Sequence, residues 1–332
     1  MQKSQSGVNL MDEYALVADL GGTRMRVALV DRAGQMHHRS TAPTDAHTGR
    51  DAVVERFVVA FEHAISEAGP ERPVGVGVSL AGPTDPETGV MHNPPNLPGW
   101  DGYSLKPLLE TRLSLRASFG NDATLAAVAE HKHGAGRPYK HMVYMTLSTG
   151  IGGGVIIDGR LYTGARGHAG EIGHVTIDRN GPTCNCGNVG CLEAMASGTA
   201  VARMAAERLS SGEATSLSGG EGAAPDAQAV FKAARSGDAV AEGIVEEVAT
   251  NLGIGIVSLI HAFDPEAIVI GGGLSQSLEQ LLPGVNREIE LHSMAHQRQG
   301  VPVVRSELGD DVGLLGAAVL AFAAHDSAGE PA

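Results

Sequence analysis

The residues with the clearest chemical meaning are one histidine and all three cysteines of the chain. They are His174, Cys184, Cys186 and Cys191. An odd number of crowded cysteines does not suit a disulfide framework and is more typical of a reducing compartment. Three thiolates and one imidazole complete the tetrahedral shell of a zinc ion and leave no open position, so we predict a structural Zn²⁺ site. The alternative is an accidental cluster of thiols beside a histidine.

The segment that this zinc site would hold also carries side chains able to bind hydroxyl groups. Residues 170–193 include Glu171, His174 and Glu193. Once fixed in place, such groups can bind the hydroxyls of a sugar, although exposed glutamates are more often only part of the solvated surface. His168 lies close by in the sequence, which assigns it no role.

Two glycine-rich turns follow apolar sequences of β-strand type. One is Asp19-Leu20-Gly21-Gly22-Thr23, and the other spans residues 148–154 and includes Thr149 and Gly150. Neither a P-loop nor a Rossmann fingerprint is present. Bare glycines let backbone N–H groups converge on phosphate oxygens, and the threonine hydroxyls can add donors. Each turn alone could be a tight hairpin, but two with the same layout favour a nucleotide-binding site.

Asn121 and Asp122 stand at the junction between a predicted strand over residues 114–119 and a predicted helix over residues 123–131. A carboxylate at such a junction either caps the helix or reaches out as a general base. Farther upstream, Asn96 lies in a proline-rich loop. That loop is either a packing turn or a rigid holder for an amide that faces a ligand.

The elements that must position these residues form a repeated pattern. A strand, a glycine turn and a returning strand open the chain over residues 14–30, and the same order returns over residues 143–157. Strands and helices alternate along the chain, which is typical of α/β architecture. We therefore predict two related α/β lobes with a cleft between them. A strand over residues 267–270 leads into Gly271-Gly272-Gly273.

The predicted domain boundaries follow from these elements. They are a disordered tail over residues 1–12, an N-terminal lobe over residues 13–122 joined by a helix within residues 311–324, and a C-terminal lobe with the zinc loop over residues 123–310. The chain beyond residue 323 is expected to be disordered. Residues 211–226, rich in Ser, Gly, Ala and Glu, are expected to form a surface excursion without chemistry.

Charge and apolar content exclude several classes of partner. The 332 residues carry a formal net charge of −14, with 24 Lys and Arg against 38 Asp and Glu, so the averaged field repels nucleic acid and anionic lipid surfaces. The most apolar run, residues 252–263, is too short to span a bilayer and predicts a buried helix. No signal-peptide pattern opens the chain. We expect a cytoplasmic protein with no nucleic-acid and no membrane partner.

From Asp19 to Ala318 the sequence resembles the ROK family of repressors, open reading frames and kinases. The matching motifs are Asp19-x-Gly-Gly-Thr23, the loop of residues 93–100, Asn121-Asp122-Ala123, Thr149-Gly-Ile-Gly-Gly-Gly154, Gly167-x-Ala-Gly-Glu-Ile-Gly-His174, Cys184-x-Cys-Gly-x-x-Gly-Cys-x-Glu193, Ala196-Ser-Gly198 and Ile270-Gly-Gly-Gly-Leu-Ser275. The cysteine stretch joined to Glu-x-Gly-His is specific to the family, whereas the glycine runs are shared with all actin-like ATPases. Two positions depart from the family pattern: Ser148 stands where many members have glycine, and Thr124 where many have asparagine.

The resemblance implies an actin-like, ribonuclease-H-like fold of two lobes that close on ATP and a sugar. In such kinases the aspartate that matches Asp122 takes the proton of the attacking hydroxyl, usually O6 of a hexose. The residues implied to bind the other hydroxyls are Asn96, Asn121, Glu171, His174 and Glu193, with His174 also binding zinc through its second ring nitrogen. Asp19 would hold Mg²⁺. The residues implied to hold ATP are Gly21, Gly22, Thr23, Thr149 and Gly150 at the phosphates and Gly271, Gly272, Gly273 and Leu274 at the adenosine.

Within the family, the resemblance implies a glucokinase that phosphorylates glucose at O6 and acts as a homodimer or homotetramer. Kinases of N-acetylmannosamine, N-acetylglucosamine and fructose remain alternatives, because the pocket near the C2 substituent is not visible in a sequence. Family repressors carry a DNA-binding domain ahead of the sugar-binding body, and only residues 1–18 precede Asp19 here. A non-catalytic sugar-sensing regulator is the alternative from another class.

Overall fold

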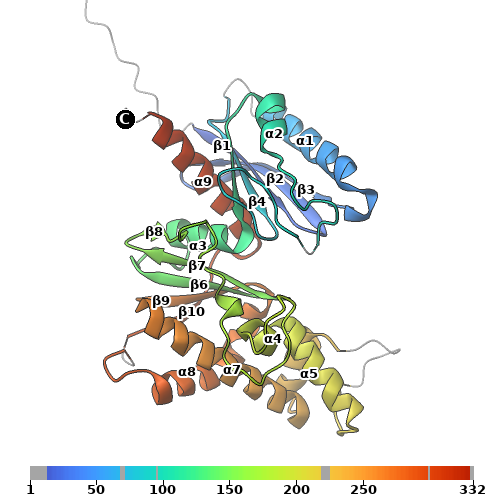
Figure 1. Ribbon diagram of the computed structural model, residues 1–332, viewed down its shortest axis with the longest axis vertical. Helices are drawn as coiled ribbons and strands as arrows, with labels where there is room; N and C mark the ends of the chain where they lie inside the picture. Colours follow the sequence, from blue (N-terminus) through green and yellow to red (C-terminus); the bar gives the residue numbers. More distant parts are fainter. Residues whose placement is uncertain (1–12, 68–71, 95, 218–224, 298–299, 330–332) are drawn as a thin grey trace, which may run out of the picture. The chain divides into compact units, whose positions relative to one another are not determined.

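The computed structural model describes residues 13–67, 72–94, 96–217, 225–297 and 300–329. They divide into two compact units, each with its own sheet (Figure 1). Unit 1 takes the described residues of Met1–His133, Thr163–His168 and Asp310–Ala332, and unit 2 those of Gly134–Tyr162 and Ala169–Gly309. The tail expected over residues 1–12 and residues 218–224 of the expected surface excursion lie outside the described residues.

The sheet of unit 1 has five strands in the order β3-β2-β1-β4-β5. They are β1 (Tyr14–Leu20), β2 (Arg24–Asp31), β3 (Met36–Pro43), β4 (Val76–Leu80) and β5 (Ala117–Asn121). β1 pairs antiparallel with β2 and parallel with β4. All five residues of β4 are buried, as expected for a parallel strand that is covered on both faces.

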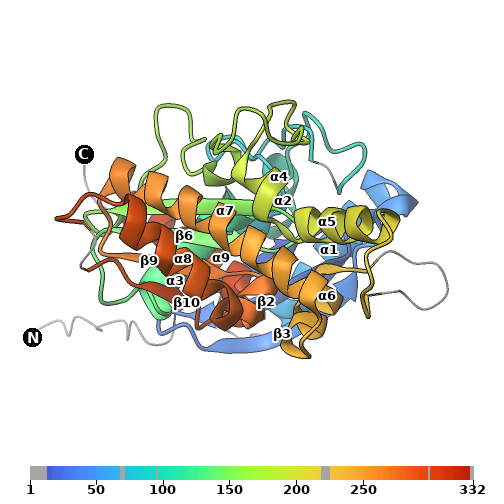
Figure 2. The same cartoon turned by 90° about the horizontal axis from the view of Figure 1, so that it is seen from below.

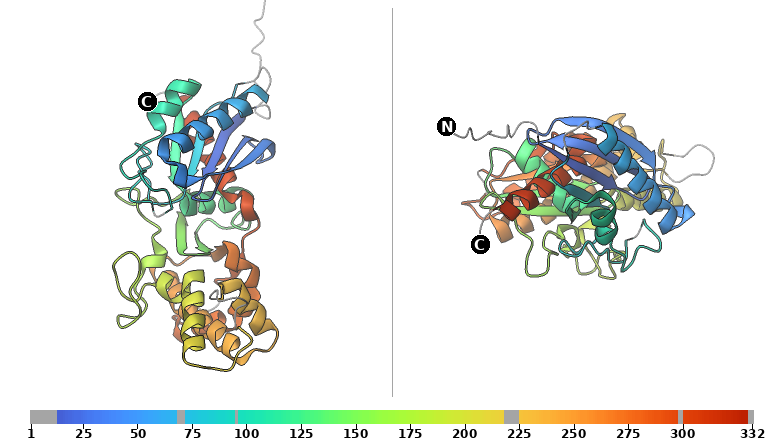
Figure 3. Two further views of the ribbon diagram at one scale, coloured as in Figure 1. Left: turned by 90° about the vertical axis from the view of Figure 1, so that its right-hand side faces the viewer. Right: turned by 90° about the horizontal axis from the view of Figure 1, so that it is seen from above.

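Helices cover both faces of this sheet (Figures 1 and 3). They are α1 (Arg50–Glu67), α2 (Lys106–Leu113), α3 (Asp122–His133) and α9 (Val312–Gly329), with short 3₁₀ turns at Ala46–Thr48 and Gly309–Asp311. The helix α1 buries Phe57 and Phe61, whose rings meet edge to face with centroids 4.8 Å apart. Against the other face, α9 packs so closely that a Cβ at Gly77 of β4 would lie 1.9 Å from the Ala317 carbonyl oxygen.

The expectation of disordered chain beyond residue 323 is wrong as far as residue 329, because α9 continues to Gly329. An ion pair joins Asp326 to Arg32, with 2.7 Å between Oδ1 and Nη2. The Arg32 guanidinium also lies over the Phe322 ring, 4.6 Å from its centroid. These contacts attach the last turns of α9 to the end of β2, which the apolar pattern alone does not indicate.

Unit 2 repeats the sheet of unit 1. Its strands are β6 (Met142–Leu147), β7 (Ile151–Ile157), β8 (Arg160–Leu161), β9 (Ala267–Gly271) and β10 (Val303–Arg305), in the order β10-β9-β6-β7-β8. β6 pairs antiparallel with β7 and parallel with β9, just as β1 pairs with β2 and β4. The duplicated α/β fold predicted from the two hairpins is therefore present.

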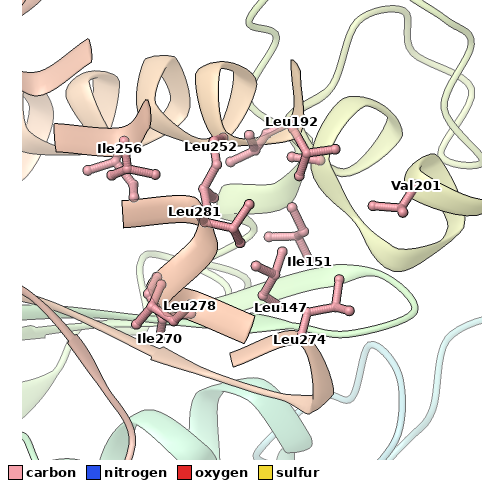
Figure 4. Packing of buried hydrophobic residues seen from close by; sticks show 14 of the residues in the cluster. Leu147, Ile151, Leu192, Val201, Leu252, Ile256, Ile270, Leu274, Leu278 and Leu281 are labelled. Atoms are coloured by element: carbon pink, nitrogen blue, oxygen red, sulfur yellow. The ribbon is translucent and has the colours of Figure 1, made fainter. Parts of the chain in front are cut away.

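The helices of unit 2 bury one continuous apolar core. They are α4 (Leu192–Ala196), α5 (Gly198–Ser210), α6 (Ala227–Arg235), α7 (Ala239–Phe263) and α8 (Leu278–His292), with 3₁₀ turns at Ile172–His174 and Gly273–Ser277. The helices α7 and α8 lie side by side (Figure 2). Figure 4 shows Leu252 and Leu281 from these helices in one cluster with Leu147 and Ile151, which flank the second glycine turn.

The second glycine turn is shorter than the sequence analysis indicates. β7 already begins at Ile151, so only Ser148–Gly150 form the turn. The remaining glycines pair with β6, Gly152 opposite Thr146 and Gly153 opposite Met145. A Cβ at Gly153 would lie 2.4 Å from Ile172 Cδ1, so this glycine lets the 3₁₀ turn Ile172–His174 pack closely on the sheet and is not part of a turn itself.

Two helical segments in the described residues are long and apolar enough to cross a membrane by length and composition, α7 and Gly309–Ala328. The expectation that no segment reaches this length is therefore wrong, because α7 begins at Ala239, well before the apolar run. In the apolar 18-residue stretch of α7 that meets this criterion, 67% of the residues are buried. Core helices of soluble proteins meet the same criterion, and the apolar residues of α7 belong to the core of unit 2.

Candidate functional site

The first glycine turn, called turn 1 here, consists of Gly21–Thr23 between β1 and β2, and Asp19 lies at the end of β1 beside it. The carboxylate of Asp19 is mostly buried and has a partner on each oxygen. Oδ1 accepts from Ser79 Oγ at 2.8 Å, and Oδ2 pairs with Arg26 Nη2 at 2.6 Å. A Cβ at Gly313 of α9 would lie 2.9 Å from Oδ1, so the glycine leaves room for this carboxylate.

Thr44 holds turn 1 at both ends and is fully buried. Its hydroxyl donates to the Gly21 carbonyl at 2.7 Å, and its backbone N–H donates to the Thr23 carbonyl at 2.9 Å. No described residue accepts a hydrogen bond from the backbone N–H of Gly22 or Thr23. Two successive free N–H groups in a fixed turn form a cradle for an anion such as a phosphate oxygen.

Asn96 lies directly against turn 1. A Cβ at Gly22 would be 2.4 Å from Asn96 Cβ and 2.9 Å from its carbonyl oxygen. The loop that carries Asn96 is anchored by Leu97 and Trp100, each 1% exposed. Because Asn96 itself is exposed, the apolar anchors place an amide at the surface beside turn 1.

Of the two roles that the sequence left open at this junction, the structure shows helix capping, and it assigns that role to Asn121. Asn121 Oδ1 accepts from the backbone N–H groups of Ala123 and Thr124 at 2.9 and 3.3 Å, so Asn121 caps α3. Its amide nitrogen donates to the Gly82 carbonyl at 3.0 Å. Asp122 is exposed at the first turn of α3, where Oδ1 also accepts from Ala123 N–H at 2.9 Å. Thr124, one of the departures, donates from its hydroxyl to the Asn121 carbonyl at 2.9 Å and supports this turn.

The second glycine turn, called turn 2, consists of Ser148–Gly150 and is held by the start of α5. Gly198 N–H donates to the Ser148 carbonyl at 2.7 Å, and the Thr199 hydroxyl donates to the Thr149 carbonyl at 2.8 Å. No described residue accepts from the backbone N–H of Thr149 or Gly150. Turn 2 therefore presents the same kind of cradle as turn 1.

A pocket of about 410 Å³ opens beside turn 2 within unit 2. Of the residues expected at a nucleotide, it is lined by Thr149, Gly273 and Leu274. Ser148 belongs to the predicted turn itself, but sequence reasoning missed the rest of the lining, which is Gly198, Thr199, Ala202, Asp226, Ala227 and Gln228. The motif Ser197-Gly198 was visible but was given no role. Asp226, the N-cap of α6, was expected to lie in a segment without chemistry, and it and the α6 residues carry no local signal because only the fold brings them to turn 2.

Gly271 and Gly272 do not line this pocket but shape the strand end next to it. A Cβ at Gly271 would lie 2.1 Å from the Tyr144 hydroxyl oxygen. Gly272 has a φ of +81° and lies against the Leu147 carbonyl, which a Cβ would approach to 2.5 Å. Only glycine fits both positions, and together they direct the chain from β9 into Gly273 and Leu274.

The structure brings the predicted zinc ligands together. One ligand atom from each of His174, Cys184, Cys186 and Cys191 lies within 4.8 Å of every other. The pairs His174 Nδ1 to Cys184 Sγ and Cys186 Sγ to Cys191 Sγ are each 3.7 Å apart. With Zn–S bonds of about 2.3 Å, sulfurs on a tetrahedral zinc ion stand about 3.8 Å apart, so the donor set and its spacing fit zinc.

Burial makes two of these thiols, those of Cys184 and Cys191, poor acids without a cation. Desolvation raises the pKa of Cys184 to about 12 and also raises the pKa of Cys191, whereas the backbone N–H of Asn188 lowers the pKa of the exposed Cys186. Three thiolates in this small volume need a positive charge among them. A bound divalent cation would supply it.

The three side chains expected to bind hydroxyls surround this cluster, which is named the zinc cluster below. His174 Nδ1 faces Cys184, while Nε2 lies 4.0 Å from Glu171 Oε2. Glu193 Oε1 lies 3.7 Å from Cys184 Sγ, and its Oε2 accepts from the Ile151 N–H at 2.8 Å. His168 belongs to unit 1 and meets the ring of His92 edge to face, with centroids 6.4 Å apart.

Comparison with known proteins agrees with this geometry. The sequence profile of the ROK family matches residues 15–324. Glucokinases of Thermotoga maritima and Halalkalibacterium halodurans are 38% and 34% identical over 90% and 92% of this chain, and the matches cover 94% of each relative. A ROK family glucokinase from Streptomyces griseus, solved with glucose and AMPPNP, is 32% identical with a TM-score of 0.78 over 93% of this chain and 99% of that one.

Two mixed sheets of identical topology, each with its own helices, define an α/β protein of the actin-like ATPase class. The chain belongs to the ROK family. The family resemblance drawn from the motifs and the predicted fold class are both confirmed.

Proposed function

We propose that the protein is an ATP-dependent hexose kinase, a glucokinase that transfers the γ-phosphoryl group of ATP to O6 of glucose. The observation that carries the proposal is its similarity to glucokinases over at least nine-tenths of the chain, which spans the elements of both units. The predicted sugar kinase activity also agrees with the S. griseus glucokinase, which was solved with a sugar and an ATP analogue.

In unit 1, Asp122 is the catalytic base. Its position at the start of α3 leaves the carboxylate exposed, while Asn121 meets the capping needs of the helix. The carboxylate accepts the proton of the attacking hydroxyl as the O–P bond forms, a contribution worth about 10²- to 10⁴-fold in rate. Phosphoryl transfer needs little else from a protein beyond positioning and charge neutralisation.

The phosphates of ATP bind to the free N–H groups of turns 1 and 2, supported by the hydroxyls of Thr23 and Thr149. The adenosine occupies the pocket lined by Gly273 and Leu274. Asp19 lies beside turn 1, and its carboxylate is the kind of oxygen donor that Mg²⁺ takes together with phosphate oxygens. Arg26 and Ser79 hold the Asp19 carboxylate in place, and a magnesium ion held there would neutralise charge on the phosphates.

The sugar hydroxyls bind to Asn96, Asn121 and Asp122 from unit 1. In unit 2 the corresponding groups are Glu171, His174 and Glu193. The zinc cluster orients this second set, because His174 turns Nδ1 toward the cysteines and leaves Nε2 for Glu171 and the sugar. Fixing one ring nitrogen in this way sets the tautomer and direction of the other.

Several finer assignments belong to the same proposal. The protein acts in the cytoplasm, in glycolysis, as a homodimer or homotetramer with no nucleic-acid or membrane partner. N-acetylmannosamine and N-acetylglucosamine kinases are the rivals within the family, and a sugar-sensing regulator without catalysis is the rival outside it.

The deciding experiment is ATP-Mg²⁺ turnover against glucose, mannose, fructose, N-acetylglucosamine and N-acetylmannosamine, with zinc measured on the same sample. We expect a clear preference for glucose and about one zinc ion per chain. Preference for an acetamido sugar would move the substrate and keep the mechanism. If folded, zinc-containing protein phosphorylated none of these sugars, the kinase assignment would be rejected in favour of a sugar sensor.

A further inference from the structure

Glu193 is shared between two parts of unit 2, because its carboxylate oxygens have different neighbours. Oε2 accepts from the backbone N–H of Ile151 at 2.8 Å. Oε1 lies 3.7 Å from Cys184 Sγ. Ile151 directly follows turn 2, whereas Cys184 belongs to the zinc cluster. One side chain therefore joins the zinc cluster to the turn that faces the pocket.

The surroundings leave this link little freedom. A Cβ at Gly150 would lie 2.4 Å from Glu193 Oε2, and a Cβ at Gly173 would lie 2.0 Å from the Ile151 carbonyl oxygen. Glu193 itself is fixed from behind, because the neighbouring Leu192 is fully buried and its N–H donates to the Val175 carbonyl at 2.9 Å. A displacement of the zinc cluster that moves the Glu193 carboxylate therefore also moves the acceptor of the Ile151 N–H.

We propose that Glu193 is a positioning residue for the nucleotide and that it couples the occupancy of the zinc cluster to ATP affinity. This inference rests on the proposed function and assigns Oε2 to turn 2, leaving only Oε1 for a sugar hydroxyl. With the cysteines gathered around a cation, Glu193 holds Ile151 and the cradle of turn 2 keeps its shape. When the cluster opens, the Ile151 N–H loses its acceptor and the cradle loosens.

The test compares two substitutions of Glu193. If Glu193 only bound sugar, both would have the same effect on nucleotide binding measured without sugar. Glu193→Gln keeps a carbonyl oxygen that can accept from Ile151 N–H, whereas Glu193→Ala leaves that donor without a partner. The readout is the Kd of AMPPNP with Mg²⁺ and without sugar, by calorimetry, with zinc content measured on each variant. We expect Glu193→Ala to weaken binding about tenfold and Glu193→Gln to stay within about twofold of the wild type.

Glu171→Ala is the matched control. Glu171 faces the same histidine but makes no hydrogen bond or ion pair with turn 2 among the described residues, so this variant should leave the Kd of AMPPNP unchanged. An unchanged Kd in Glu193→Ala with zinc retained would overturn the positioning role and leave the kinase intact. Wild-type protein that fails to bind AMPPNP would instead remove the proposed function itself.

Amide hydrogen exchange on the wild type decides the matter if Glu193→Ala does not fold. Removing zinc with a chelator should speed exchange in the peptide of residues 148–154 and leave the peptide over turn 1 unchanged. Exchange that stays the same, or that rises throughout unit 2 rather than in this peptide, contradicts the coupling.

Discussion

The sheets of the two units place different side chains at equivalent positions. In unit 1, Asp19 is the penultimate residue of β1 and is paired with Arg26 on β2 and Ser79 on β4. In unit 2, Thr146 is the penultimate residue of β6 and is paired with Gly152 on β7 and Gly271 on β9. A three-residue turn follows in both units, Gly21–Thr23 in one and Ser148–Gly150 in the other.

This difference shows which properties come from the fold and which come from individual side chains. Both hairpins produce a turn with free N–H groups, so the anion cradle follows from the repeated backbone. Unit 1 adds a carboxylate held by an arginine and a serine. In unit 2, Gly152 and Gly271 occupy two of the three equivalent positions. With Gly272 and Gly273 they bring the backbone to the edge of a pocket. Under the proposed function, the catalytic and the magnesium-binding carboxylates thus belong to unit 1 and the adenosine pocket to unit 2.

The largest expected effect is loss of turnover on changing Asp122 to Asn. Asn keeps an oxygen that can accept from Ala123 N–H, so α3 should form as before. Without the base, kcat should fall by about 10³-fold while the Kd for glucose changes little. Steady-state kinetics and calorimetry check both values. Turnover within tenfold of the wild type would show that the base lies elsewhere.

Changing Asp19 to Asn tests the group that Asp19, Arg26 and Ser79 form in unit 1. The amide can still accept from Ser79, but its NH₂ group would face the buried Arg26 guanidinium with no acceptor between them. We expect kcat/KM for ATP-Mg²⁺ to fall about 100-fold and stability to drop by about 2 kcal/mol, as for the loss of a hydrogen bond to a charged group.

A second substitution separates the two effects. Arg26→Met added to Asp19→Asn removes the guanidinium that has lost its carboxylate partner and keeps only the bond from Nη1 to the Asp310 carbonyl, so the melting temperature should recover in part while activity stays low. Recovery of activity together with stability would mean that Asp19 serves only the packing of unit 1.

Replacing Cys184 by Ser tests the zinc cluster of unit 2. Loss of one of four ligands should remove most of the zinc, and because metal binding contributes to folding, the free energy of unfolding should fall by about 3 kcal/mol or more. Elemental analysis and thermal unfolding on the same preparation give both values. Asn185→Ser, at a neighbouring exposed position, is the control. A Cys184→Ser protein with full zinc and wild-type stability would contradict a structural metal.

The sequence predicted the architecture well because its strongest signals were local. The strand, turn and strand pattern indicated both hairpins, and the spacing of three cysteines after His174 indicated a cluster that the structure assembles. That Asn121 caps α3 could not be read from the residue types, since both Asn and Asp cap helices and only the contacts with Ala123 and Thr124 show it.

The features that the sequence did not predict share a physical cause, which is contact between segments that are distant in the sequence. Thr44 holds turn 1 from the far end of β3, and Asp226 and Gln228 reach the pocket from α6. The last turns of α9 are held by Arg32 on the loop after β2. A single sequence carries no signal for such pairs, because neither partner forms a recognisable motif by itself.

Replacing one glycine by alanine in each turn tests how rigidly turn 1 and turn 2 are held. In Gly22→Ala the new Cβ meets the Cβ and carbonyl oxygen of Asn96, which is fixed by its anchored loop, whereas in Gly150→Ala it meets only the end of the Glu193 side chain. We expect Gly22→Ala to lower kcat/KM for both substrates about tenfold, and Gly150→Ala to lower it for ATP about threefold. Gly243→Ala, where a Cβ meets nothing within 4 Å, is the control. A larger effect of Gly150→Ala than of Gly22→Ala would show that turn 2 is held more rigidly than turn 1.

The smallest expected effect concerns Asp238, a carboxylate of unit 2 that serves structure alone. It caps α7, where Oδ1 accepts from Ala241 N–H at 3.0 Å and Oδ2 accepts from the Ser216 hydroxyl at 2.7 Å. These bonds, led by the one from Ala241, hold the pKa of Asp238 below its usual range. The folded pKa is thus lower than the unfolded value of about 3.9, so the stabilisation is complete above that pH and is lost as the pH falls toward the folded pKa.

Changing Asp238 to Ala should therefore cost about 1 kcal/mol at pH 7, the usual value of a helix cap, and less near pH 3. Asp238→Asn, which can still cap α7, should cost less than the alanine variant. Urea unfolding at the two pH values measures the difference, and the kinetic constants should not change. A cost that is the same at pH 3 as at pH 7 would mean that the carboxylate charge contributes nothing. Altered kcat with intact stability would contradict a purely structural role for Asp238 and would weaken the contrast drawn between the carboxylates of the two units.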